Sequence, residues 1–190
     1  MINEIYFNNF PNLESERLIL RKLELTDASD VQLIRSDEKV MIYMDSERHK
    51  TIQFSENFIS KNLKMYKEKA GIFWAIIEKS TGTFIGDFAF FKIDHKNSRT
   101  EIGYTLKPEF WKKGFMKEAM LNIFNFGFED LNLHSLEANI NPENDNSRAI
   151  LTKMGFQKEA YFRENYFYNG DYLDSEIYSL LKSNYQKSKK

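Results

Sequence analysis

The sequence contains no cysteine, and its net charge is close to zero. The chain has 190 residues, of which 42% are hydrophobic and 29% are charged, with a formal net charge of −1. Without thiols it can build no disulfide scaffold, no zinc site with cysteine ligands, no iron–sulfur cluster and no covalent intermediate on a cysteine sulfur. Nucleic-acid-binding domains are usually strongly basic on one face, so the balanced charge argues against nucleic acid as the main partner.

Long apolar runs are missing as well. The N-terminal residues, MINEIYFNNF, have neither a basic segment nor an apolar run of about 7–15 residues, so we expect no secretory signal. No stretch approaches the roughly 20 apolar residues of a membrane span. We therefore expect a cytoplasmic protein that does not insert into a membrane. The length suits one domain of roughly 100–200 residues, and no repeat or linker divides it, so residues 1–190 should form a single domain.

Hydrophobic periodicity predicts an α+β fold. Runs rich in β-branched and aromatic residues indicate strands, and spacings of three and four residues indicate helices, the first of them capped by Thr26. Asn169-Gly170 is one of the stronger short hairpin signals. The expected strands cover residues 17–23, 72–78, 84–91, 100–106, 135–140, 157–168 and 172–181, and the expected helices begin at 26 or cover 54–66, 116–127 and 146–154.

The residues from Glu101 to Ala119 suggest an anion site. A strand ends at Leu106, a loop with one glycine, Gly114, follows, and then a long amphipathic helix begins. Unpaired N–H groups and the positive end of the helix dipole favour phosphate there, and a glycine lets the backbone approach an anion closely. The segment therefore fits a pyrophosphate, although an ordinary turn with solvated lysines would also explain it. The lysines that would add charge are Lys112, Lys113 and Lys117.

A second polar segment, residues 141–148, precedes the helix expected at 146–154. Taken alone it could simply cap that helix. Together, the two segments resemble the GNAT acetyltransferase superfamily, and within it the RimJ/RimL-like branch of ribosomal-protein N-terminal acetyltransferases. The likeness runs from Leu13 through the final hairpin. The family's phosphate loop, Q/R-x-x-G-x-G/A, keeps Gly114 but departs at Trp111 and Met116, whereas the motifs N-x-x-S and K-x-G-F are fully matched by Asn144, Ser147, Lys153, Gly155 and Phe156.

The resemblance implies a fold and a donor. The expected fold is a single mixed, mostly antiparallel sheet of about six to seven strands, flanked by about four helices, with a splayed strand pair that forms an acetyl-CoA cleft. Acetyl-CoA would donate its acetyl group without a metal, and the backbone N–H of Leu106 would stabilise the oxyanion. The residues expected to bind acetyl-CoA are Tyr104, Leu106, Lys112, Lys113, Gly114, Phe115, Met116, Lys117, Asn144 and Ser147.

Two proton transfers need side chains. Many relatives protonate the departing thiolate with a tyrosine, but the matching position here is Leu151, so Ser147 becomes the candidate donor, with helix capping as its alternative role. Glu101 is the first candidate base, although it could instead be a surface carboxylate paired with Arg99 or a lysine. Tyr166, on the strand that opens the final hairpin, is the second. Weaker candidates are Asp87, Glu137 and His134.

The expected reaction is acetyl transfer to a primary amine, first of all the α-amine of a protein N-terminus such as that of a ribosomal protein. Because no acetyl-cysteine can form, transfer should be direct within a ternary complex. The alternatives are a polyamine, for which Asp171, Asp174 and Glu176 could provide charge, a small antibiotic amine, or a non-catalytic acyl-CoA-binding module. We expect a monomer or a homodimer.

Overall fold

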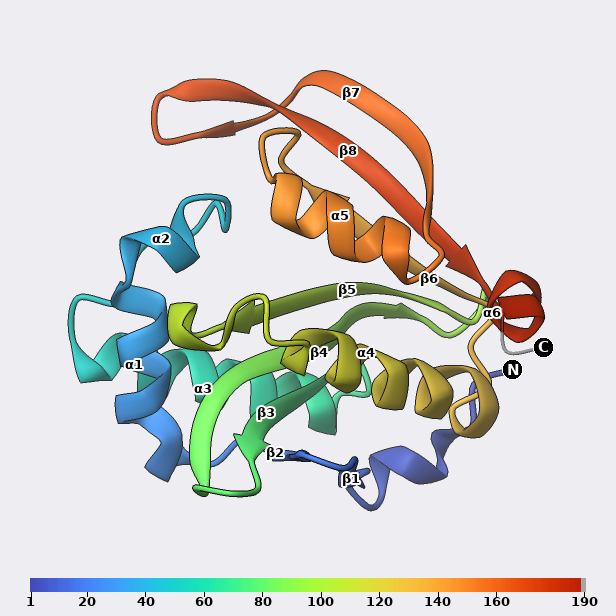
Figure 1. The fold of residues 1–190 in the computed structure, drawn as a ribbon, viewed down its shortest axis with the longest axis horizontal. Helices are drawn as coiled ribbons and strands as arrows, with labels where there is room; N and C mark the ends of the chain where they lie inside the picture. Colours follow the sequence, from blue (N-terminus) through green and yellow to red (C-terminus); the bar gives the residue numbers. More distant parts are fainter. Residues whose placement is uncertain (189–190) are drawn as a thin grey trace.

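The computed structural model describes residues 1–188 and places their strands in one mixed sheet (Figure 1). The order across the sheet is β1-β2-β3-β4-β5-β6-β8-β7, and β5 and β6 are its parallel pair. Within these residues the sheet has eight strands, so the expectation of about six to seven was wrong. The strand that was not expected is the short β1, two residues long, which pairs with β2. The strands are β1 (Leu13–Glu14), β2 (Leu18–Lys22), β3 (Ile72–Glu78), β4 (Thr83–Asp94), β5 (Arg99–Leu106), β6 (Ser135–Ile140), β7 (Gln157–Tyr168) and β8 (Asp171–Leu181).

Six α-helices, rather than about four, lie within residues 1–188. The two that the sequence pattern did not predict are short: α2 is a single turn, and α6 follows β8 directly. Tyr185 anchors α6 because its ring is buried against that of Phe128, with 4.9 Å between the ring centroids. The helices are α1 (Ala28–Ser36), α2 (Glu38–Met41), α3 (Ile52–Lys67), α4 (Phe115–Asn125), α5 (Asp145–Lys153) and α6 (Lys182–Ser188).

The start of α1 differs from the prediction that Thr26 caps it. The backbone N–H of Glu24 donates to the carboxylate of Asp27 at 2.8 Å, and the Arg21 guanidinium holds the same carboxylate at 2.7 Å. Thr26 instead makes a long contact of 3.5 Å with the Glu24 carboxylate. Asp27, held by the ion pair from β2, therefore caps the short 3-10 turn Leu25–Asp27 that precedes α1, and α1 itself begins without a side-chain cap hydrogen bond.

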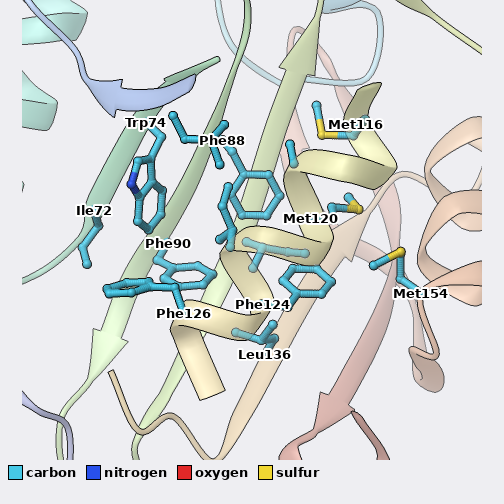
Figure 2. Close-up of a cluster of buried hydrophobic side chains, with 14 of the residues drawn as sticks. Ile72, Trp74, Phe88, Phe90, Met116, Met120, Phe124, Phe126, Leu136 and Met154 are labelled. Carbon is cyan, nitrogen blue, oxygen red and sulfur yellow. The ribbon is translucent and has the colours of Figure 1, made fainter. Parts of the chain in front are cut away.

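Hydrophobic residues pack on both faces of the sheet. On one face, α4 buries its predicted stripe of Met116, Ala119, Met120, Ile123 and Phe124 against aromatic rings of β3 and β4, as Figure 2 shows. On the other face, α1 and α3 cover a smaller cluster. At about 25 cal/mol per Å² of buried apolar surface, these two layers supply the main favourable term in folding. They also hold β4 and β5 rigidly between them.

The parallel pair β5 and β6 separates along its length. Only three residue pairs match, ending at Glu101 and Glu137, whereas β4 stays paired with β5 as far as Leu106. The N–H of Lys107, just after β5, donates to the carbonyl of Ile85 on β4. Because N–H directions alternate along a strand, the N–H groups of Tyr104 and Leu106 point the other way, into the gap beside β6. The splayed edge predicted from the resemblance is therefore present in the register.

Candidate active site

The gap between β5 and β6 opens into a cavity of about 1010 Å³. Residues of β5 alternate across the sheet, so Tyr104 and Leu106 face α4 and α5, and Glu101 and Thr105 face α1 and α3. Tyr104 stacks on Phe88 of the α4-side core with 5.8 Å between ring centroids. Residues from both sides line the same cavity. It therefore joins the two faces of the sheet through the splayed edge.

The loop before α4 has the geometry of an anion cradle. Trp111 donates its indole N–H to the carbonyl of Leu106 at 2.7 Å, which fixes the loop to the end of β5. Gly114 then adopts a left-handed φ of 83°. The first backbone bond of the helix runs from Glu118 to Gly114, so the N–H groups that precede it in the first turn have no acceptor within the helix. Such groups, at the positive end of the helix dipole, bind phosphate.

An N-terminal anchor holds this loop, and sequence reasoning missed it. The Glu118 carboxylate accepts hydrogen bonds from the Ser15 hydroxyl at 2.7 Å and from the backbone and side chain of Arg17 at 2.8 and 2.6 Å. Burial opposes ionisation of Glu118, but these bonds outweigh it and hold its pKa below the usual value. Arg17 also donates to the carbonyl of Lys113 in the loop. The first turn of α4 is therefore tied to the chain just before β2.

Asn144 and Ser147 lie at the start of α5. The side chain of Asn144 accepts the backbone N–H of Ser147 at 3.0 Å, so Asn144 caps the helix. Ser147 lines the cavity and lies near Tyr104, whose ionised form it favours. Burial nevertheless raises the pKa of Tyr104 to about 12, and its hydroxyl has no hydrogen-bond partner among the described residues. A neutral phenol therefore faces the cavity beside the serine.

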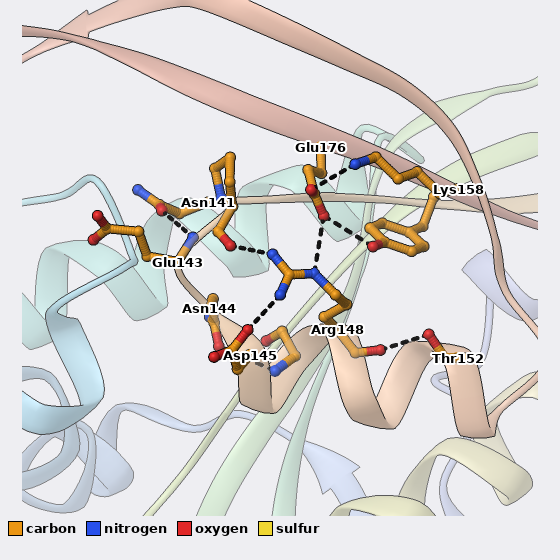
Figure 3. Close-up of polar contacts among 11 residues, drawn as sticks. Asn141, Glu143, Asn144, Asp145, Arg148, Thr152, Lys158 and Glu176 are labelled. Carbon is orange, nitrogen blue, oxygen red and sulfur yellow. Dashed lines mark hydrogen bonds and ion pairs between the residues drawn. The ribbon is translucent and has the colours of Figure 1, made fainter.

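A charged network fixes α5 to the C-terminal hairpin (Figure 3). Arg148, next to Ser147, donates to the buried Glu176 carboxylate on β8 at 3.2 Å, and Lys158 and Tyr178 donate to the same carboxylate at 2.6 and 2.9 Å. Burial raises the pKa of Glu176, but these three partners lower it by more, so the pKa lies below its usual value. Arg148 also bonds to the carbonyl of Pro142. The serine is thus held at the cavity by ion pairs on its neighbour.

Most predicted site residues line this one cavity. They are Glu101, Tyr104, Leu106, Lys112, Gly114, Phe115, Met116, Lys117, Asn144, Ser147 and Tyr166. Lys113 lies outside the lining, with its ammonium 5.8 Å from the ring centroid of Phe110. The acidic residues considered for a polyamine, Asp171, Asp174 and Glu176, lie outside it too.

The candidate bases occupy different surroundings. Glu101 pairs with Lys92 at 2.6 Å, while Arg99 pairs with Glu137 instead. Tyr166 donates its hydroxyl to the carboxylate of Asp45 at 2.6 Å, and burial together with this acid raises its pKa well above the usual value. Tyr166 therefore keeps its proton at neutral pH.

The remaining candidates lie around the same region with other partners. Asp87, opposite Thr105 on β4, lines the cavity and is paired with Arg35. His134 is exposed and lies outside the lining. Sequence reasoning missed Arg35, although a visible signal existed, since it falls four residues after Val31 on the buried face of α1.

Within residues 1–188, no group of three or more His, Asp or Glu side chains is placed to hold a metal ion. No helix in that part of the chain is long and apolar enough to cross a membrane.

Comparison with known proteins matches this geometry to one family. The sequence profile of the acetyltransferase (GNAT) domain matches residues 17–157. The uncharacterized N-acetyltransferase YoaA of Bacillus subtilis is 36% identical over 173 residues, which cover 91% of this chain and 98% of that protein. Spermidine N-acetyltransferase from Vibrio cholerae, solved with CoA and spermine, has a TM-score of 0.79 at 23% identity and covers 90% of this chain and 99% of its own. Ribosomal-protein-S5-alanine acetyltransferase from Vibrio fischeri also has a TM-score of 0.79, at 20% identity, over 92% and 98% of the two chains.

The cleft fits the donor that this family uses. Backbone N–H groups are available along the open edge of β5 and in the first turn of α4, which follows the left-handed Gly114. The buried Tyr104 hydroxyl has no hydrogen-bond partner among the described residues. A thioester that carries a pyrophosphate and an arm with amide groups could accept hydrogen bonds from these N–H groups. This chain belongs to the GNAT family of acetyltransferases, enzymes that take acetyl-CoA as their acyl donor.

Proposed function

We propose that the protein acetylates the α-amine of a protein or peptide N-terminus, in the manner of the RimJ/RimL-like branch, by direct transfer in a ternary complex. The observation that carries this proposal is the charge arrangement in the half of the cavity that faces α1 and α3. Glu101 is paired with Lys92, and Asp87 is paired with Arg35. A polycation would need unpaired carboxylates, whereas a single amine next to a neutral chain needs none.

On the donor side, the chain's own backbone does most of the binding. The N–H groups of Phe115, Met116 and Lys117 would take the phosphates, helped by the nearby lysine charges. The N–H groups of Tyr104 and Leu106 would pair with the pantetheine arm along the open edge of β5. When bound, acetyl-CoA supplies an activated thioester carbonyl. The Leu106 N–H would stabilise the charge that develops on its oxygen, an interaction typically worth about 2.7–4 kcal/mol.

Ser147 and Glu101 would handle the protons. Ser147, beside the neutral Tyr104, would donate to the departing thiolate. Glu101 reaches the cavity from the opposite face of the sheet and would accept the amine proton, directly or through water. An α-amine has a pKa of about 8, so part of it is neutral at pH 7 and a modest base suffices. Tyr166 is the weaker choice, because its hydroxyl is engaged by Asp45 and holds its proton.

Two other functions are alternatives to this proposal. One is a polyamine acetyltransferase, because the TM-scores to the spermidine and the ribosomal-protein enzymes are equal and the fold alone does not choose between them. Asp45, on the cavity wall, is the carboxylate that a polyamine could use. A non-catalytic acyl-CoA-binding module would bind CoA tightly and turn over no amine.

The test measures CoA release with a thiol reagent, for which a chain without cysteine gives no background. Acceptors are peptides with a free α-amine, the same peptides blocked at the α-amine but carrying lysine, spermidine and an aminoglycoside. We expect turnover on the free α-amines and intersecting initial-rate lines. Parallel lines with an acetyl-enzyme would refute direct transfer, and release with none of the acceptors would refute the enzymatic proposal.

Variants assign the proton roles. Ser147→Ala and Glu101→Gln should each lower kcat by about 10²–10⁴-fold, the usual contribution of a positioned acid or base. The matched control is Glu137→Gln, because Glu137 lies directly opposite Glu101 on β6, pairs with an arginine and does not line the cavity. Equal kcat in Glu101→Gln and Glu137→Gln would remove Glu101 from the mechanism.

A further inference from the structure

Three buried side-chain atoms have no hydrogen-bond partner among the described residues, and all three belong to residues that line the same cavity. They are Nε of Arg35, the hydroxyl of Tyr104 and the hydroxyl of Thr105. Buried polar groups are nearly always paired, because an unpaired one costs free energy. Tyr104 faces the donor side. The other two lie on the side of α1 and α3, where the acceptor must bind.

Arg35 is held rigidly in the acceptor half. Its guanidinium lies 3.9 Å from the ring centroid of Phe58 on α3, and its Nη2 lies 3.3 and 3.4 Å from the two carboxylate oxygens of Asp87. Arg35 is 6% exposed and Asp87 is 2% exposed, so neither can turn to solvent. With Nη2 directed at the acid, Nε–H remains a buried donor without a partner among the described residues, on a side chain that lines the cavity. Burial raises the pKa of Asp87, although Arg35 and the neighbouring Thr105 oppose the rise.

This arrangement selects the chemistry of its ligand. A guanidinium N–H only donates, so the ligand must present an oxygen acceptor to Arg35. A carboxylate would bring a second acid beside Asp87, whose own ionisation is already opposed by burial, whereas a carbonyl adds no charge. Thr105 lies opposite Asp87 on the neighbouring strand, so its hydroxyl is on the same face, where it favours the ionised form of Asp87 and keeps its lone pairs to accept an N–H. A carbonyl oxygen and an N–H together make a peptide group.

We propose that Arg35 and Thr105 bind the first peptide group of the acceptor, with Arg35 Nε donating to its carbonyl and the Thr105 hydroxyl accepting its N–H. This inference rests on the proposed acetylation of α-amines and names the residues that would recognise the peptide behind the amine. It separates peptide N-termini from polyamines, which have no carbonyl. Asp87 is then a positioning residue, because it holds Arg35 and does not touch the acceptor.

The experiment compares three acceptors on wild-type and variant enzymes. Alanine N-methylamide has both the carbonyl and the N–H, alanine methyl ester has the carbonyl alone, and 3-methylbutan-2-amine has neither. The variants are Arg35→Lys, which keeps a cation beside Asp87 but removes Nε–H, and Thr105→Val, which removes only the hydroxyl. Arg48→Lys is the control, because Arg48 is half exposed in its pair with Glu38 and lies outside the cavity lining. Rates are expressed per neutral amine, since a carbonyl lowers the amine pKa.

Arg35→Lys should lower kcat/KM by about tenfold to a hundredfold on the amide and the ester and leave the carbonyl-free amine nearly unchanged. Thr105→Val should lower it up to about tenfold on the amide alone. Arg48→Lys should leave kcat/KM unchanged on all three acceptors. Equal losses on all three acceptors, with unchanged Tm, would overturn the inference while the proposed function stands. Absence of transfer by the wild type to any acceptor would overturn both. Thr105→Val provides a second variant that leaves both members of the Arg35–Asp87 ion pair in place.

Discussion

Replacement of Gly114 by alanine tests the anion cradle most directly. Gly114 has φ of 83° and lies at the N-cap of α4. A left-handed conformation costs an L-residue about 1–2 kcal/mol, so the free energy of unfolding should fall by that amount. A Cβ at this position would meet only the end of the flexible Arg17 side chain, at 3.4 Å, so packing adds little to the cost. The fold should therefore survive the change.

CoA binding should suffer more than stability. The added methyl group would lie where the loop backbone must approach the pyrophosphate, so at least one charge-assisted hydrogen bond is lost. Such a bond is worth about 1.5–3 kcal/mol, which corresponds to about a tenfold to hundredfold rise in Kd. Isothermal titration calorimetry with CoA gives the Kd, and urea denaturation gives the free energy of unfolding of the same sample.

The chain offers a matched control in Gly82, in the turn between β3 and β4. Gly82 has φ of 67°, and a Cβ there would meet nothing within 4 Å. Gly82→Ala should therefore lose about the same 1–2 kcal/mol of stability and keep its affinity for CoA. If the Kd values of the two variants agree within about twofold, the loop does not hold the phosphates and the assignment of the donor site is wrong.

Two further predictions concern stability. Burial and the nearby Arg35 lower the pKa of His49 to about 4, so between its ordinary pKa of 6.5 and about 4 the unfolded chain binds a proton that the folded chain does not. The free energy of unfolding should therefore fall as the pH drops through that window. In urea titrations, His49→Gln should make the decrease in this free energy between about pH 7 and pH 5 smaller by up to about 2 kcal/mol. An unchanged decrease would mean that the histidine is not buried as a neutral group. Glu118→Gln should cost about 1–3 kcal/mol, because it breaks the bonds to Ser15 and Arg17. The same change at Glu14, in an exposed pair with Lys79, should cost under about 1 kcal/mol, and equal costs would contradict the anchor.

The elements predicted from periodicity lie close to where the structure has them. The strands at residues 72–78 and 135–140 coincide with β3 and β6, and Asn169-Gly170 forms the hairpin turn with both φ values positive. These signals are local, since alternation, helical spacing and turn residues act over a few neighbours. The short α2 and β1 carry too few residues for a period and were missed. Thr26 was expected to cap α1, but it lies inside the preceding turn Leu25–Asp27, and α1 has no side-chain cap hydrogen bond.

The sequence by itself predicted the segments of the proposed donor half of the site, whereas the proposed acceptor half depends on tertiary contacts. The loop around Gly114 and the motif of Asn144 and Ser147 are contiguous segments whose backbone geometry follows from their own residues. Arg35 meets Asp87 only when α1 packs on the sheet, and Tyr166 meets Asp45 only when the hairpin reaches the loop after α2. Contacts between residues distant in the chain depend on how the layers pack, so no short pattern records them. The sequence therefore left several acceptor amines possible. The folded cavity names the side chains whose replacement can distinguish these acceptors by measurement.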